Sequence, residues 1–123
     1  PVLSQKLEEA GMQKLFDEVD SRLFDPTLSL KGLAAQFGYS EKYILQLFKK
    51  KYGETFLQYL QRRRIENART LLAETDLSVA EIARRCGYTG DQSFRRNFVQ
   101  STSLTPGEYR SKMALEKQRS TDD

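Results

Sequence analysis

The sequence predicts an all-α protein of about seven helices, with two helix–turn–helix subdomains joined by a long connecting helix. Three observations support this class: apolar residues recur at helical spacing, no segment alternates like a strand, and one motif occurs twice. Three prolines and seven glycines in 123 residues leave little room for a loop-rich fold. This length suits one compact domain or two small subdomains that share a helix.

The repeated motif recurs at an offset of about fifty residues. The segment 28–39 runs from Leu-Ser-Leu through Leu-Ala-Ala to Gly-Tyr, and the segment 77–88 runs from Leu-Ser-Val through Ile-Ala-Arg to Gly-Tyr. One extra residue near Gly90 lengthens the offset beyond these pairs. The positions that then match are Ile44 and Phe94, Phe48 and Phe98, Thr55 and Thr105, and Tyr59 and Tyr109. The duplication predicts two similar docking surfaces on one chain.

The region 1–28 is predicted to be an acidic lead-in that ends in the first helix. Gly11 interrupts its pattern, so the helix is expected from about 12 to 24, after a frayed beginning. Pro26 ends it, because the residue before a proline avoids the helical region. Three apolar residues define the packed face of this helix, namely Leu15, Val19 and Leu23.

The region 29–54 has the features of a first helix–turn–helix. Two short helices, over 30–37 and 41–51, each follow a serine that can cap their first turn. Each is followed by a glycine that can adopt a left-handed conformation. The capping serines are Ser29 and Ser40, and the glycines are Gly38 and Gly53.

The region 55–76 is predicted to form the connecting helix, and 77–117 the second helix–turn–helix with a C-terminal helix. Thr55 caps the connecting helix, which runs from about 56 to 73. The later helices are expected at 79–86, 91–101 and 106–117, and residues 118–123 as a disordered tail. Capping boxes are predicted at two of these starts, from Ser78 with Glu81 and from Thr105 with Glu108.

The spacing inside each copy fits a DNA-reading helix–turn–helix. Such a motif needs a small residue in its first helix, a glycine in the turn and an apolar residue that locks the second helix against the first. With Leu30 as position one, the first copy has Ala34 fifth, Gly38 ninth and Ile44 fifteenth. In the second copy Ala83 and Gly87 hold the fifth and ninth places, and the apolar residue comes one place later at Phe94.

Positive charge is concentrated on the repeated part of the chain. Residues 1–28 contain three basic and six acidic side chains, whereas 29–110 contain fourteen basic and eight acidic ones. Residues 111–123 contain three of each. This distribution favours an anionic partner, and nucleic acid first.

Several function classes lack the residues they need. The chain has no histidine and one cysteine, Cys86, so internal disulfides and histidine-dependent nucleophiles are excluded. We expect no enzyme activity, cofactor or metal site, and we expect Cys86 to be a small core residue. No apolar run approaches the length of a transmembrane span, and no signal-peptide pattern opens the chain, so we expect a cytoplasmic protein without membrane contact. Because the chain starts without methionine, a preceding effector-binding or dimerisation domain is also expected.

From Leu28 to Arg110, about two-thirds of the chain, the sequence resembles the AraC/XylS family of bacterial transcription regulators. The resemblance implies seven helices, two helix–turn–helix subdomains and gene regulation, usually activation, through promoter DNA and RNA polymerase. The matching segments are LSLKGLAAQFGYSEKYILQLFKKKYGETFLQYL, RRIENARTLL, LSVAEIARRCGYTGDQSFRRNF and LTPGEYR.

The family pattern places base contacts on the outer faces of the second helix of each motif. Arginine can pair with guanine, glutamine with adenine, lysine with guanine or phosphate, and leucine can pack on a thymine methyl. Asp91 can accept from a cytosine amine, or it can orient Arg95. The positions carried over are Lys42, Leu45, Gln46, Asp91, Gln92, Arg95 and Arg96.

Phosphate contacts are expected from helix starts and from basic residues beside the reading faces. For the basic residues, an ordinary solvated surface is the alternative. The candidates are Ser29, Ser40, Lys49, Lys50, Ser78 and Arg62. A connecting helix of about 27 Å could hold two recognition helices in successive major-groove segments, which recur every ~34 Å.

The sequence departs from the family at three positions. Many members have arginine at Gln46, most have glycine at Ser103, and an aromatic residue is usual at Ser93. We therefore expect the second reader to have the stronger guanine specificity. The alternative is a helical protein-binding adaptor, which would need exposed apolar anchors where this chain has mainly charged and amide side chains.

Overall fold

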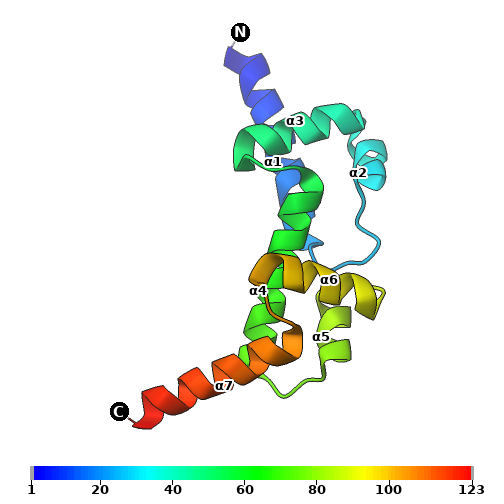
Figure 1. Ribbon diagram of the computed structural model, residues 1–123. Helices are drawn as coiled ribbons and strands as arrows, with labels where there is room; N and C mark the ends of the chain where they lie inside the picture. Colours follow the sequence, from blue (N-terminus) through cyan, green and yellow to red (C-terminus); the bar gives the residue numbers. More distant parts are fainter. Residues whose placement is uncertain (1, 123) are drawn as a thin grey trace. The chain divides into compact units, whose positions relative to one another are not determined.

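The computed structural model describes residues 2–122, with side chains up to Ser120, and over this range it contains seven helices and no strand. The all-α class and its seven helices are thereby confirmed. The helices are α1 (Val2–Ser21), α2 (Leu30–Phe37), α3 (Glu41–Tyr52), α4 (Phe56–Glu74), α5 (Val79–Arg85), α6 (Asp91–Thr102) and α7 (Pro106–Asp122) (Figure 1). They form two compact units, one up to Leu60 and one from Gln61, so that α4 contributes to both.

The first unit has an aromatic core centred on Phe48 of α3. Its ring lies 5.2 Å from that of Phe16 on α1, 5.4 Å from Phe56 and 5.5 Å from Tyr59 at the start of α4. Figure 1 shows α3 lying across α1 in this unit. The Tyr59 hydroxyl donates to Asp20 Oδ1 of α1 at 2.6 Å, which adds a directional contact to the apolar packing.

The second unit repeats this plan with different residues. Ile65, Ala68 and Leu72 of α4 are buried against α5 and α6. At an offset of 49 residues these positions match buried residues of α1, namely Phe16, Val19 and Leu23. The duplication therefore includes the helix before each motif, and α4 serves as the last helix of one copy and the first of the next.

Two boundaries differ from expectation at the N-terminal helix. The interpretation of Gly11 as a break was wrong, because α1 is continuous from Val2 and ends earlier than expected, at Ser21. A mid-helix glycine costs only about 1 kcal/mol, which neighbouring turns can offset. Gly11 also makes room for Tyr39, because a Cβ on Gly11 would lie 2.9 Å from the Tyr39 hydroxyl.

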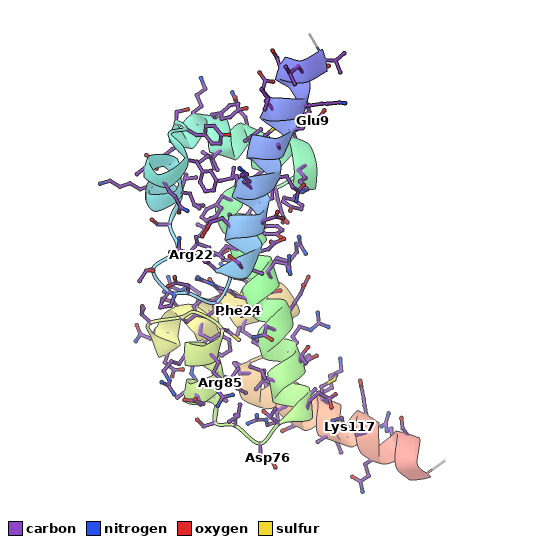
Figure 2. The ribbon with its side chains drawn as sticks, turned by 180° about the vertical axis from the view of Figure 1, so that it is seen from behind. Glu9, Arg22, Phe24, Asp76, Arg85 and Lys117 are labelled. Atoms are coloured by element: carbon purple, nitrogen blue, oxygen red, sulfur yellow. The ribbon has the colours of Figure 1, made fainter. Side chains whose placement is uncertain are left out.

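The C-terminal helix also exceeds its expected length. A disordered tail was expected from 118, but α7 continues to Asp122, while Asp123 lies outside the described residues. Residues from Lys112 to Arg119 include Met, Ala, Leu, Glu, Lys and Gln, which favour helix even when exposed. Lys117 Nζ donates to the Ala73 carbonyl oxygen at 2.7 Å and so links α7 to the end of α4 (Figure 2).

Most helix starts are capped as the sequence predicts. Thr55 and Gln58 exchange two hydrogen bonds at the start of α4, and Thr105 and Glu108 do the same at α7. Ser78 forms only half of its box. Its hydroxyl accepts from the Glu81 amide, but the Glu81 carboxylate accepts from Arg84 and Arg85 instead.

Candidate nucleic-acid interface

The outer face of α3 presents the residues predicted for the first reader. Ile44, Leu47 and Phe48 are buried, which fixes the rotation of the helix. Residues at spacings of three and four share one helical face. The exposed residues opposite the core are Lys42, Leu45, Gln46 and Lys49.

The outer face of α6 has the same geometry and a different chemistry. Phe94 and Phe98 are fully buried, and the predicted reading residues lie on the exposed side. Val99, which takes the place of Lys49, lies on this face and is 41% exposed. Sequence reasoning missed Val99, although the offset of fifty residues from Lys49 marks it. The exposed set is Asp91, Gln92, Arg95, Arg96 and Val99.

Asp91 and Arg95 form an ion pair within the second reading face. Arg95 Nε donates to Asp91 Oδ2 at 2.9 Å, and both side chains are about half exposed. This ion pair restricts the orientation of the Arg95 side chain. Arg96 forms no hydrogen bond or ion pair with the described part of the chain, so its guanidinium can meet a base without first breaking a contact.

The residues predicted to contact phosphate are all exposed, but they differ in what already engages them. The hydroxyls of Ser29, Ser40 and Ser78 accept from backbone amides of their own helices at 3.0–3.1 Å. Lys49 Nζ donates to the Gly53 carbonyl oxygen at 3.2 Å, and Arg62 pairs with Glu66 at 2.9 Å. Exposed ion pairs such as that of Arg62 contribute little free energy, so they hold the side chain only weakly.

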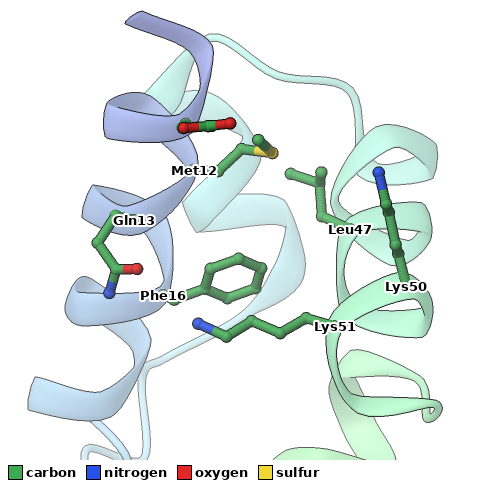
Figure 3. Close-up of a pocket in the computed structure, with 7 residues that line it drawn as sticks. Met12, Gln13, Phe16, Leu47, Lys50 and Lys51 are labelled. Carbon is green, nitrogen blue, oxygen red and sulfur yellow. The ribbon is translucent and has the colours of Figure 1, made fainter. Parts of the chain in front are cut away.

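Lys50 lies on a different side of α3 from the reading face. It borders an open cavity of about 360 Å³ between α1 and α3, in which Met12 and Phe16 face Leu47 (Figure 3). Lys51 crosses the same cavity, with its ammonium nitrogen 4.1 Å from the centroid of the Phe16 ring. This cation–π contact holds Lys51 against the core of the first unit.

Cys86 is buried, as the sequence predicts. Burial raises the pKa of the Cys86 thiol to about 11, although Asn67 donates to its sulfur at 3.5 Å and Arg64 lies nearby. The thiol form therefore predominates at neutral pH, and this side chain has the properties of a core residue rather than a redox sensor.

Arg64 is the buried residue that sequence reasoning missed. In the sequence, residues 62–64 form a run of three arginines that suggests one basic surface, but the third is only 9% exposed and lies against Gly87. The repeat indicated this burial, because Arg64 matches the fully buried Leu15 at the offset of 49 residues.

The described residues offer neither a metal-ion site nor a membrane span. Among the side chains described between residues 2 and 120, no group of three or more histidine, cysteine or carboxylate residues could hold a metal ion. Over the same range, no helix is both long enough and apolar enough to span a membrane.

Comparison with known proteins places the motif in a family. A family model described as a helix-turn-helix domain matches residues 33–112. The chain is 37% identical over 102 residues to the uncharacterized HTH-type transcriptional regulator YijO of Escherichia coli. This match covers 83% of the chain and 36% of YijO. The chain is also 37% identical over 87 residues to YtdP of Bacillus subtilis, covering 71% of this chain and 11% of YtdP. The chain therefore spans only 36% of the length of YijO and 11% of the length of YtdP.

Solved structures give the same result. The C-terminal domain of the response regulator YesN from Fusobacterium nucleatum is 30% identical with a TM-score of 0.75, over 80% of this chain and 95% of that one. The DNA-binding domain of AdpA, solved in complex with a target DNA, is 25% identical with a TM-score of 0.79, over 87% and 96%. This chain therefore belongs to the AraC/XylS family of helix–turn–helix transcription regulators and is a DNA-binding domain of that family.

Proposed function

We propose that the chain reads a specific double-stranded DNA site by inserting α3 and α6 into successive major-groove segments. The observation that supports this most is the pair of equivalent exposed faces, each fixed by buried aromatic and aliphatic residues on the opposite side. Base readout needs donors and acceptors on a rigid helix, and both faces provide them. AdpA, which has the same fold, was solved with its target DNA.

In this proposal the two readers have unequal tasks. Arg95 and Arg96 of α6 would contact guanine O6 and N7, and Gln92 would contact adenine. The reading face of α3 has no arginine; its side chains are Lys42, Leu45 and Gln46. It therefore offers fewer ways to form a bidentate guanine contact, and the part of the DNA site that α3 reads should tolerate more sequences.

Phosphate contacts would fix the register of both readers without selecting a sequence. We assign this role to Lys49, Lys50 and Arg62, together with the helix starts at Ser29, Ser40 and Ser78. Lys49 is the strongest of these candidates, because it lies on the reading face of α3 and its ammonium group forms only one exposed hydrogen bond.

We further propose that this domain works as the C-terminal part of a larger regulator. YtdP and YijO, which it matches, extend well beyond the matched region. An N-terminal domain would sense an effector or form a dimer, and the regulator would act mainly as an activator that contacts RNA polymerase. Such a protein acts on the chromosome in the bacterial cytoplasm. Neither an enzymatic reaction nor a cofactor is part of this proposal.

The proposal is tested by selecting bound duplexes from a random library and sequencing them. Two enriched blocks about one helical turn apart are expected, because each reader should enter one groove segment. A failure to enrich any sequence would contradict the proposal and favour the protein-binding adaptor. A single enriched block would show that only one reader selects bases.

A further inference from the structure

A buried arginine of the connecting helix lies under the turn of the second motif. Arg64 of α4 is the one charged residue classed as buried between residues 2 and 120. A Cβ built on Gly87 would lie 2.8 Å from Arg64 Nε and 2.9 Å from Cζ. Gly87 also has a φ of +95°. The turn therefore requires glycine at position 87 for two reasons. Its backbone conformation is left-handed, and the guanidinium beneath it leaves no room for a Cβ.

Tyr88 connects this arginine to the second recognition helix. The Arg64 guanidinium carbon lies 5.8 Å from the centroid of the Tyr88 ring. The same ring lies 5.3 Å from the ring of Phe94, and the Tyr88 hydroxyl accepts from Asn97 Nδ2 at 3.3 Å. Both partners are on α6. Because Phe94 and Asn97 flank the two arginines between them in sequence, Tyr88 holds the segment that presents both reading arginines.

The first unit holds its turn in another way. Leu15 takes the place of Arg64, and a Cβ on Gly38 would meet nothing within 4 Å. Tyr39, which takes the place of Tyr88, packs its ring on Phe37 and Tyr43 instead. The contact of an arginine with the turn is therefore specific to the second unit.

A buried guanidinium costs free energy that a leucine would not, because a charge must leave water. The fold itself can use leucine at this position, as the first unit does. What leucine cannot provide is a flat, rigid cation that packs at once on a glycine backbone and on an aromatic ring. The chemistry of Arg64 therefore points to a role beyond filling the core.

We propose that Arg64 is a positioning residue of the second reader. It fixes the turn at Gly87 and the ring of Tyr88, and through Phe94 and Asn97 it sets the angle at which α6 presents its arginines to DNA. The inference rests on the proposed function, in that α6 must read bases. It goes further by making the specificity of one reader depend on a residue that contacts no DNA.

The experiment compares Arg64→Leu with Arg63→Leu in the duplex selection described above. Arg64→Leu introduces the residue found at this position of the first unit. Arg63→Leu removes one charge from the neighbouring, partly exposed position of the same helix. The block that α6 reads is identified first with Arg96→Ala. Helicity and thermal unfolding of each variant show whether it is folded.

We expect folded Arg64→Leu to keep the preference of the block read by α3 and to lose about ten-fold in the block read by α6, on the order of a typical coupling energy. Arg63→Leu should retain both preferences. Equal weakening of both blocks, or no change, in a folded Arg64→Leu would overturn the proposal. If the wild-type chain selects no sequence, the proposed function itself has failed, which is a different result.

A second variant covers the case in which Arg64→Leu does not fold. Tyr88→Phe keeps the ring over Arg64 and Phe94 but removes the acceptor of Asn97. Tyr88→Phe should reduce the sequence preference less than Arg64→Leu does, and again only in the block read by α6. A profile identical to that of the wild type at both blocks would contradict the path from Arg64 to α6.

Discussion

At the scale of single residues, the two arginines that we propose for base reading on α6 differ in their contacts within the protein. Arg95 is paired with Asp91, whereas Arg96 is exposed and forms no hydrogen bond or ion pair with the described residues. The two adjacent arginines therefore differ in their local contacts, although they are neighbours in the sequence.

Arg96→Ala should cost about 1–3 kcal/mol at one base pair and relax specificity there, because a bidentate guanine contact is lost. The measurement is the binding profile across a randomised site. Arg119→Ala, which removes an exposed arginine of α7, is the control and should leave the profile unchanged. If Arg96→Ala also leaves every position unchanged, Arg96 reads no base.

Ser103 is the only non-glycine residue with a positive φ among the described residues, at 65°. It ends α6 where the left-handed conformation strains a side chain. Ser103→Gly should therefore stabilise the fold by about 0.5–1 kcal/mol, since relief of the strain exceeds the entropy cost of glycine. Chemical denaturation measures this change, and an unchanged or lower free energy of unfolding would contradict it.

At the scale of elements, the N-terminal caps divide into complete and incomplete boxes. Thr105 and Glu108 exchange both hydrogen bonds, and this contact lowers the pKa of the Glu108 carboxyl. Glu81 has a lowered pKa for another reason, because Arg84 and Arg85 donate to it. The same sequence pattern thus has two physical outcomes.

Thr105→Ala should cost about 1 kcal/mol of stability, as loss of a helix cap typically does. A double-mutant cycle with Glu108→Ala should show positive coupling, and the corresponding cycle of Ser78→Ala with Glu81→Ala should show little. Denaturant unfolding of the single and double variants measures both cycles. Equal coupling in the two cycles would mean that Glu81 turns back to its cap in solution.

At the scale of the whole molecule, the excess of positive charge in residues 29–110 can attract DNA only where individual lysines are free to reach it. Lys49 lies on the reading face of α3, Lys50 borders the cavity, and Lys51 lies over Phe16. Three consecutive residues thus face three environments because successive residues of a helix are about 100° apart.

Lys49→Ala should weaken binding to all DNA sequences alike and lower the slope of log affinity against log salt by about one. Lys51→Ala serves as the matched control, since its ammonium is held on an aromatic ring and should leave the slope unchanged. Titrations of one duplex at several salt concentrations give both slopes. A slope unaffected by Lys49→Ala would assign that lysine to the solvated surface.

The sequence by itself determined the helix class, the duplication and most helix starts, because spacing, caps and turn glycines are local properties. It also indicated which face of α3 and α6 is exposed, since burial of Phe48 and Phe98 follows from helical periodicity. Tertiary packing decided the rest. Gly11 lies inside a helix at a place where the Tyr39 hydroxyl leaves no room for a Cβ, and Arg64 is buried beneath Gly87 and Tyr88. Such contacts join residues far apart in the chain, and no local pattern specifies them.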